Sequence, residues 1–172
     1  AGRAIAAAVQ CDFEEIGGFP ADGRLLVLAG KGHNGGDALI AAHAFLEKYP
    51  AASADVVFAF GERSLRPLAA RAWREFVHAA PGRVTSRRTL AGAAAGECAD
   101  HGCTGGGPGY ALSLDGIFGF QFRAPVPENV VALFAQVARC DIRLRAAVDL
   151  PSGLSDENRH DERHDPQHLE KP

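Results

Sequence analysis

A glycine-dense turn joins a strand pattern to a helical pattern near the start of this chain, and this order constrains the fold more than any other feature. Residues 25–29 read Leu-Leu-Val-Leu-Ala, the continuous apolar run of a strand covered on both faces. Gly30, Gly32 and Gly35 follow in the spacing G-x-G-x-x-G, which permits a tight turn, close approach of the backbone to an anion and close helix packing. The segment therefore predicts a cradle for a phosphate or nucleotide, although such turns also serve as plain connections.

Apolar runs alternate with helical patterns along the rest of the chain. Helices are expected over 1–16, 36–48, 64–79, 89–99 and 126–139, and strands over 24–29, 55–60, 83–86, 110–114 and 145–150. No periodicity is visible over 102–109, which is expected to be a loop. The alternation predicts an α/β fold with a parallel sheet and helices on both of its faces.

Composition narrows the class of protein. The 172 residues are 47% hydrophobic and 23% charged, the balance of one globular domain. The formal net charge of -3 and the scattered arginines give no basic footprint, so no nucleic-acid partner is expected. No apolar stretch approaches the roughly 20 residues that span a bilayer, so no membrane partner is expected either. The chain contains no methionine, and we expect its true start, with any targeting segment, to be missing.

The cysteines give no metal-binding pattern. None of them shows C-x-x-C spacing, and reduced, mostly buried thiols are expected at Cys11, Cys98, Cys103 and Cys140. An aspartate and a histidine lie between Cys98 and Cys103, but a structural zinc site needs four ligands in a tetrahedral array and no second cluster is near in sequence. Zinc is therefore not predicted.

Polar residues follow the expected strands at the points where the strands end. Asn34 and Asp37 follow the first strand, Asp115 follows the strand at 110–114, and Asp149 and Ser152 flank the end of the last. Because parallel strands present their carboxyl ends to one ligand crevice, these side chains are expected to converge. Asp37 also has a purely structural interpretation as a helix cap.

Three of these segments carry a resemblance to a known family. Residues 30–38 approximate G-x-G-N-N-G-G-D-G, residues 115–120 read Asp-Gly-Ile-Phe-Gly-Phe, and residues 149–153 read Asp-Leu-Pro-Ser-Gly. In this order they resemble the NAD(P)H-hydrate epimerases, or YjeF N-terminal domains, which include the apolipoprotein A-I-binding protein. The resemblance covers 1–154 and implies a Rossmann-like three-layer sandwich with a mostly parallel central sheet. Residues 155–172 are polar and are expected to form a disordered tail.

The resemblance also implies an activity. Members of the family interconvert the R and S forms of hydrated NADH or NADPH, which carry a hydroxyl at C6 of the nicotinamide ring, and an ADP- or ATP-dependent dehydratase then accepts one epimer. A homodimer in the cytoplasm is the expected state. Two alternatives stay open, a non-catalytic nucleotide-binding or interaction module of the same fold and a conventional NAD-dependent oxidoreductase, for which Glu62 is the candidate ribose-binding acid.

The resemblance assigns site residues at the positions of this chain that match the family motifs. The resemblance implies a potassium ion held by Asn34, Asp115 and Ser152, and an oxygen-only shell suits a hard cation. It implies that the substrate is lined by two segments and one further acid: His33, Asn34, Gly35, Gly36 and Asp37; Gly119, Phe120, Gln121, Phe122, Arg123, Ala124 and Pro125; and Asp149.

Asp149 is the hypothesised catalytic residue. Loss of hydroxide from C6 gives an iminium-like cation that water re-enters from either face, and a carboxylate beside that carbon can shuttle the proton. Asp37 is a second candidate, and the alternative for Asp149 is that it only accepts hydrogen bonds at the turn around Pro151. Phe120 or Phe122 could stack on a flat ring and Arg123 could meet a phosphate.

The chain departs from the family pattern in several places. His33 stands where an asparagine is usual, Ala38 replaces a common glycine, and Lys31 occupies a variable position. The family also continues through further strands after the segment around Leu154, so the chain is expected to be truncated at both ends.

Overall fold

The chain folds around one parallel sheet. The computed structural model describes residues 1–90, 109–120 and 122–152. The elements in chain order are α1 (Gly2–Glu15), β1 (Arg24–Ala29), α2 (His33–Lys48), β2 (Ser53–Phe58), the 3-10 turn η1 (Glu62–Ser64), α3 (Pro67–Ala79), β3 (Val84–Arg87), β4 (Tyr110–Gly116), α4 (Glu128–Val137) and β5 (Ile142–Ala147). The strand order is β3-β2-β1-β4-β5, and every neighbouring pair is parallel.

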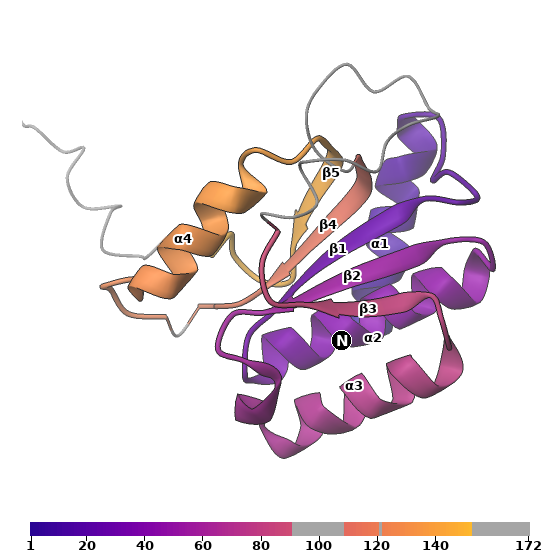
Figure 1. Cartoon of the computed structure of the whole chain (residues 1–172). Helices are drawn as coiled ribbons and strands as arrows, with labels where there is room; N and C mark the ends of the chain where they lie inside the picture. Colours follow the sequence, from indigo (N-terminus) through magenta and orange to yellow (C-terminus); the bar gives the residue numbers. More distant parts are fainter. Residues whose placement is uncertain (91–108, 121, 153–172) are drawn as a thin grey trace, which may run out of the picture.

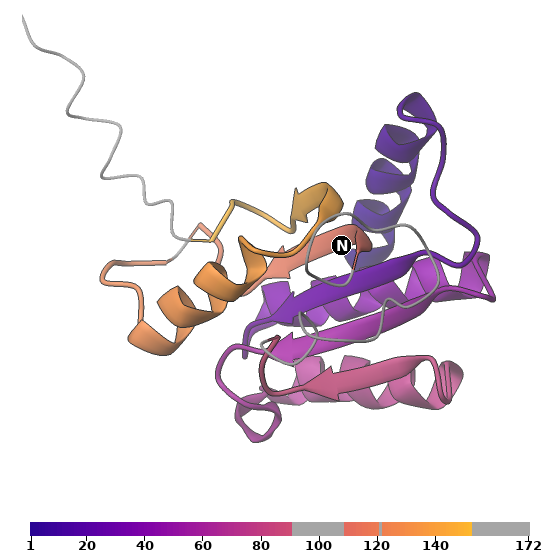
Figure 2. The same ribbon diagram turned by 45° about the horizontal axis from the view of Figure 1, so that its top comes forward.

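Helices cover both faces of this sheet. Figure 1 shows α1, α2 and α3 on one face and α4 on the other, and Figure 2 shows α4 in front of the strands with α2 and α3 behind them. The arrangement is the predicted Rossmann-like three-layer sandwich. The strand order reverses at β1, so β2 and β4 lie on either side of it. Ligands in such folds bind at the carboxyl ends of the strands beside this reversal.

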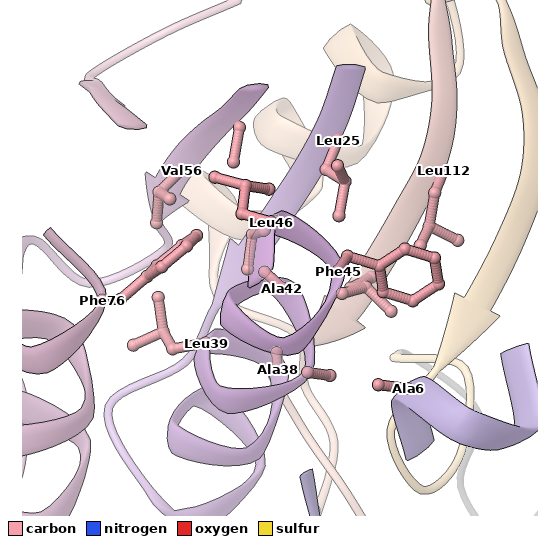
Figure 3. Packing of buried hydrophobic residues seen from close by; sticks show 14 of the residues in the cluster. Ala6, Leu25, Ala38, Leu39, Ala42, Phe45, Leu46, Val56, Phe76 and Leu112 are labelled. Carbon is pink, nitrogen blue, oxygen red and sulfur yellow. The ribbon is translucent and has the colours of Figure 1, made fainter. Parts of the chain in front are cut away.

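The larger part of the core lies between α2 and the sheet. Figure 3 shows Phe45 and Leu46 of α2 directed toward strand residues that include Leu25 and Leu112. These side chains are almost fully buried. Apolar area removed from water contributes about 25 cal/mol per Å², so this face anchors α2 and thereby its N-terminal turn. The second cluster lies under α4 and includes Val130 and Leu133.

Asp55 ties four strands together on the α4 side of the sheet. Arg24 Nη2 of β1 donates to Asp55 Oδ2 at 2.9 Å, and Arg87 Nε of β3 lies 2.7 Å from Asp55 Oδ1. The hydroxyl of Tyr110, the first residue of β4, donates to Asp55 Oδ2 at 2.8 Å. Asp55 is only 6% exposed. A buried carboxylate must be paired, so the network stabilises one strand order and one register.

Several predicted boundaries were wrong. Helix α2 begins at His33 rather than 36, so Asn34, Gly35 and Gly36 of the motif are helical. Strand β5 spans 142–147 rather than 145–150, because apolar and charged side chains alternate on this edge strand and the continuous-run criterion missed its start. Strand β2 spans 53–58 rather than 55–60, and α3 starts at Pro67, whose ring suits the first turn of a helix.

Other predictions fall partly outside the described residues. Thr89 and Leu90 are not helical, and the rest of the expected helix at 89–99, the loop over 102–108 and the tail at 155–172 lie outside the described part of the chain. Cys98 and Cys103 lie there as well, whereas Cys11 is an exposed thiol and Cys140 a half-buried one. Within the described ranges, no helix combines the length and apolar character needed to cross a membrane.

Candidate functional site

The predicted site residues lie where the carboxyl ends of β1, β4 and β5 meet. Glycines allow the loops to approach closely there, because a Cβ on Gly35 would lie 2.0 Å from the carbonyl oxygen of Gly30. A Cβ on Gly30 would lie 2.1 Å from the carbonyl oxygen of Ile117. Real side chains do not fit at such distances. The first turn of α2 is therefore pressed against both the end of β1 and the loop that follows β4.

Asn34 links the first motif to the second. Its Nδ2 donates to the carbonyl oxygen of Phe118 at 2.8 Å, across a sequence separation of 84 residues. Gly116 makes room for this contact, since a Cβ there would lie 2.4 Å from the Asn34 carbonyl oxygen and 2.7 Å from the Ala38 Cβ. The methyl group of Ala38 is thus accommodated because the facing residue has no side chain.

Asp115 links the second motif to the third. Ser152 Oγ donates to Asp115 Oδ1 at 2.7 Å, and the Ser152 backbone N–H donates to Asp115 Oδ2 at 2.8 Å. The backbone N–H of Ile117 also donates to Asp115 Oδ1, at 3.1 Å. Ser152 Oγ in turn accepts from the backbone N–H of Phe118 at 3.0 Å. Three donors fix this carboxylate, so Asp115 and Ser152 form one unit with the backbone after β4.

Asp149 belongs to the same group of residues. Its Oδ2 accepts from the backbone N–H of Phe120 at 2.8 Å, so the alternative in which it only serves the turn around Pro151 does not describe its contact. A Cβ on Gly119 would lie 2.0 Å from Asn34 Nδ2 and 2.7 Å from Asp149 Oδ2. Gly119 therefore lies between these two side chains. Asp149 is exposed, which leaves its carboxylate accessible from solvent.

Asp37 has a different environment. Its Oδ1 accepts from the backbone N–H of Gly2 at 2.9 Å, so its carboxylate serves the first turn of α1. The N-cap of α2 is Gly32, so the interpretation of Asp37 as a cap of its own helix was wrong. A carboxylate near a helix N-terminus is stabilising, which gives Asp37 a structural role at α1.

The remaining predicted substrate residues lie in the first turn of α2 and in the loop after β4. Gly35 and Gly36 are buried and His33, in the first turn of α2, is exposed; after β4, Phe122 is half-buried, Phe120 is 70% exposed, and Arg123, Ala124 and Pro125 are exposed. The predicted residue Gln121 lies outside the described ranges. Of the three phenylalanines in this loop, Phe118 and Phe122 stack on each other with ring centroids 4.1 Å apart, which leaves Phe120 unstacked.

Sequence reasoning missed the contribution of the backbone after β4. The amide and carbonyl groups of Phe118 bond Ser152 and Asn34, and the amide of Phe120 bonds Asp149. Every residue carries these groups, so no residue type signals them. The dense glycines at 116 and 119 were the available signal, because glycine marks positions where another chain segment comes close.

A cavity of about 450 Å³ lies beside this network, between α4 and the last two strands. Asp115 and Ser152 contribute to its wall together with apolar side chains such as Leu28 and Phe134. Arg145 of β5 lines it as well. The Asp115–Ser152 pair is therefore accessible from the α4 side of the sheet.

Known proteins resemble the chain in sequence and in fold. It is 40% identical over 157 residues to the bifunctional NAD(P)H-hydrate repair enzyme Nnr of Gloeobacter violaceus, covering 91% of this chain and 26% of Nnr. It is 34% identical over 138 residues to the NAD(P)H-hydrate epimerase of Bordetella pertussis, covering 80% of this chain and 51% of that protein. The chain thus spans about half of the second relative and a smaller part of the first.

A solved structure shares the fold. The crystal structure of yeast ynu0 superposes with a TM-score of 0.59 at 22% identity, over 88% of this chain and 58% of the yeast chain. At the level of families, residues 1–164 match the model described as YjeF-related protein N-terminus. Because that match takes in nearly the whole chain, including the three motifs that meet at this site, the chain belongs to the YjeF-related protein N-terminus family.

Proposed function

We propose that the chain interconverts the R and S epimers of hydrated NADH and NADPH, as part of the repair of nicotinamide cofactors. One observation carries the proposal: Asn34, Asp115, Asp149 and Ser152, from three distant motifs, are bonded to one short backbone segment, 115–120. The printed names of the Gloeobacter and Bordetella relatives support the same reaction.

Asp149 is the proposed acid/base group. The hydroxyl-bearing carbon adjoins the ring nitrogen, so departure of hydroxide leaves a cation stabilised by the nitrogen lone pair. A carboxylic acid beside that carbon protonates the leaving hydroxyl, and the resulting carboxylate accepts a proton from the water that re-enters on the other face. The Phe120 N–H orients Asp149 through Oδ2, which leaves Oδ1 for this transfer. Asp37 is the weaker candidate because its carboxylate already accepts the Gly2 N–H.

Potassium is part of the proposal, and the residues present fit it. Asn34 uses its Nδ2 for Phe118, so its Oδ1 is the atom available to a cation. Asp115 Oδ1 and Ser152 Oγ lie 2.7 Å apart, and carboxylate, hydroxyl and amide oxygens suit a hard cation. A bound potassium ion would offset the charge of Asp115 beside the substrate.

The biological setting is also proposed. The word bifunctional in the name of the Gloeobacter relative supports coupling to a second repair activity, which we propose to be an ADP- or ATP-dependent NAD(P)H-hydrate dehydratase. The homodimer rests on the family resemblance, and the cytoplasmic location is an expectation from the sequence. Sedimentation of the purified chain tests the first, and fractionation of cells tests the second.

Epimer exchange on the isolated chain tests the reaction. Pure R hydrate is mixed with an excess of an S-specific dehydratase, and recovery of the reduced cofactor is followed with and without the chain. The proposal expects recovery faster than the spontaneous rate. Nucleotide binding by a folded chain without any acceleration would instead support a binding module, and hydride transfer to a substrate would support an oxidoreductase.

A separate measurement tests potassium without relying on turnover. Melting temperatures are compared in potassium and in tetramethylammonium chloride at equal ionic strength. A ligand that binds only the folded state raises the melting temperature, so potassium is expected to do so for the wild-type chain and not for Asp115→Asn. Equal melting temperatures in the two salts would contradict the potassium site. The proposed reaction would then still be tested by the exchange assay.

A further inference from the structure

Lys31 is held in a defined place beside the proposed site. It follows Gly30, whose N–H donates to the carbonyl oxygen of Gly116 at 3.0 Å, and its own carbonyl oxygen accepts from the Arg66 N–H at 2.8 Å. The backbone at Gly30 and Lys31 is therefore bonded both to the last residue of β4 and to the residue that precedes α3. Its ammonium group lies 5.4 Å from the centroid of the Phe60 ring. A cation over an aromatic face is attracted to it, which favours this side-chain position.

A row of aromatic rings joins Lys31 to the site. Phe60 lies after β2, and its ring centroid is 6.0 Å from that of Phe118, which stacks on Phe122. The backbone of Phe118 bonds both Asn34 and Ser152. The Lys31 ammonium thus lies at one end of this row. Phe118, further along the row, is bonded through its backbone to two of the proposed potassium ligands.

Lys31 is exposed, and its ammonium group has no ion-pair partner within the described part of the chain. No carboxylate of the described residues lies within ion-pair distance of Lys31, although Glu62 is on the neighbouring loop. Asp115 and Asp149 make the inner part of the site acidic. The phosphates of a dinucleotide are negative and adjoin its nicotinamide riboside. If the nicotinamide lies at these two acids, a positive charge nearby favours binding of the phosphates.

We propose that Lys31 binds a phosphate of the dinucleotide, while the nicotinamide ring lies at Asp149. This inference rests on the proposed function and adds the residue that holds the anionic part of the substrate. The ammonium has three N–H donors, and those directed away from the Phe60 face are available to phosphate oxygens. Two phosphates are possible partners, the pyrophosphate of both cofactors and the 2′-phosphate of NADPH alone.

Calorimetric binding of NAD⁺, NADP⁺ and nicotinamide riboside to the full chain tests this inference. Lys31→Gln removes the charge, Lys31→Arg keeps it, and Lys48→Gln is the matched control. Lys48 bonds Gln10 at the far end of α2, away from the site. Lys31→Gln is expected to bind dinucleotides about ten- to a hundredfold more weakly, the effect of one hydrogen bond to a charged group, with nicotinamide riboside unchanged. Added salt should narrow the difference, since ions screen exposed charges.

The outcomes distinguish binding of the pyrophosphate from binding of the 2′-phosphate. They also distinguish failure of the Lys31 inference from failure of the proposed epimerisation. Equal losses for NAD⁺ and NADP⁺ assign Lys31 to the pyrophosphate, whereas a loss for NADP⁺ alone assigns it to the 2′-phosphate. Unchanged binding by folded Lys31→Gln, an equal loss in Lys48→Gln, or no dinucleotide binding by the wild-type chain overturns the inference. Normal binding without epimer exchange overturns the proposed reaction only. In the exchange assay, Lys31→Gln should raise KM and leave kcat unchanged.

Discussion

The carboxylate of Asp149 and the backbone N–H of Phe120 are joined by a hydrogen bond of 2.8 Å, although they belong to separate motifs 29 residues apart. Asp149 follows an edge strand and is exposed, so this bond is what fixes its position relative to the loop after β4. A catalytic acid or base must be held within hydrogen-bond reach of its proton. The position of the proposed acid/base group, Asp149, therefore depends on the backbone of the loop after β4.

Replacement of Asp149 by asparagine should abolish most of the turnover and leave the fold intact. The amide keeps the shape of the side chain and its acceptor oxygen for Phe120, but it cannot shuttle a proton. General acid–base catalysis contributes about 10²- to 10⁴-fold, so the exchange rate should fall by at least about a hundredfold. The measurement is the exchange assay, with the melting temperature as a test of folding.

Asp12→Asn is the matched control, because Asp12 is an exposed acid on α1. Its exchange rate should equal that of the wild-type chain. Normal turnover by Asp149→Asn would show that another group moves the proton.

Gly119→Ala should reduce turnover through geometry alone. The added methyl would lie 2.0 Å from Asn34 Nδ2 and 2.7 Å from Asp149 Oδ2, so at least one of the two side chains must move. A misplacement of about 1 Å can cost about a hundredfold in rate, and we expect a loss of that order. The kinetic comparison should show a lower kcat.

Gly109→Ala provides the control for a methyl group at a glycine. Gly109 precedes β4, at the opposite end of the strand, and its nearest contact would be Asp141 Oδ2 at 4.0 Å. That variant should keep wild-type turnover. Equal activity of Gly119→Ala and Gly109→Ala would mean that the loop adapts without disturbing the site.

The fold could be predicted from sequence, and so could the convergence of the polar residues that follow the strands, because both depend on residue types in a linear order. The strand after Gly23 and the residues Asn34, Asp115, Asp149 and Ser152 all lie where strand ends place them. The bonds of Asn34 and Asp149 could not be predicted, because the backbone groups of Phe118 and Phe120 supply the partner in each of them. The helical state of His33 was also missed, since close packing on Gly30 outweighs the low helix propensity of the two glycines that follow.

The partners of Asp55 in the core could not be predicted from sequence either. As a polar residue inside an apolar strand, it gives no sequence signal of its partners, which lie on three other strands. Asp55→Ala should lower the free energy of unfolding by about 3–5 kcal/mol, because it leaves two arginines beside a buried site without their carboxylate. Denaturant unfolding measures this loss.

Glu75→Gln is the contrasting variant. Its ion pair with Arg71 has a similar N–O distance, 2.8 Å, but both side chains are more than half exposed. Exposed pairs contribute less than about 1 kcal/mol, so its unfolding curve should barely move. Similar losses for Asp55→Ala and Glu75→Gln would contradict the stabilising role of the buried network.

Tyr110 should make the stability of the chain sensitive to alkaline pH. Burial raises the pKa of its hydroxyl, and the hydrogen bond to Asp55 and the charge of Asp55 raise it further. Because the pKa is higher in the folded state than in the unfolded state, this contribution is fully present below about pH 10 and is lost as the pH rises toward the folded pKa.

Tyr110→Phe has no such group, so its deficit in unfolding free energy should stay constant up to about pH 10 and then shrink, by up to about 1.4 kcal/mol per pH unit. Denaturant titrations of both chains from pH 7 to above about pH 10 measure the difference. A constant deficit across that range would mean that Tyr110 ionises equally easily in the folded and unfolded chains.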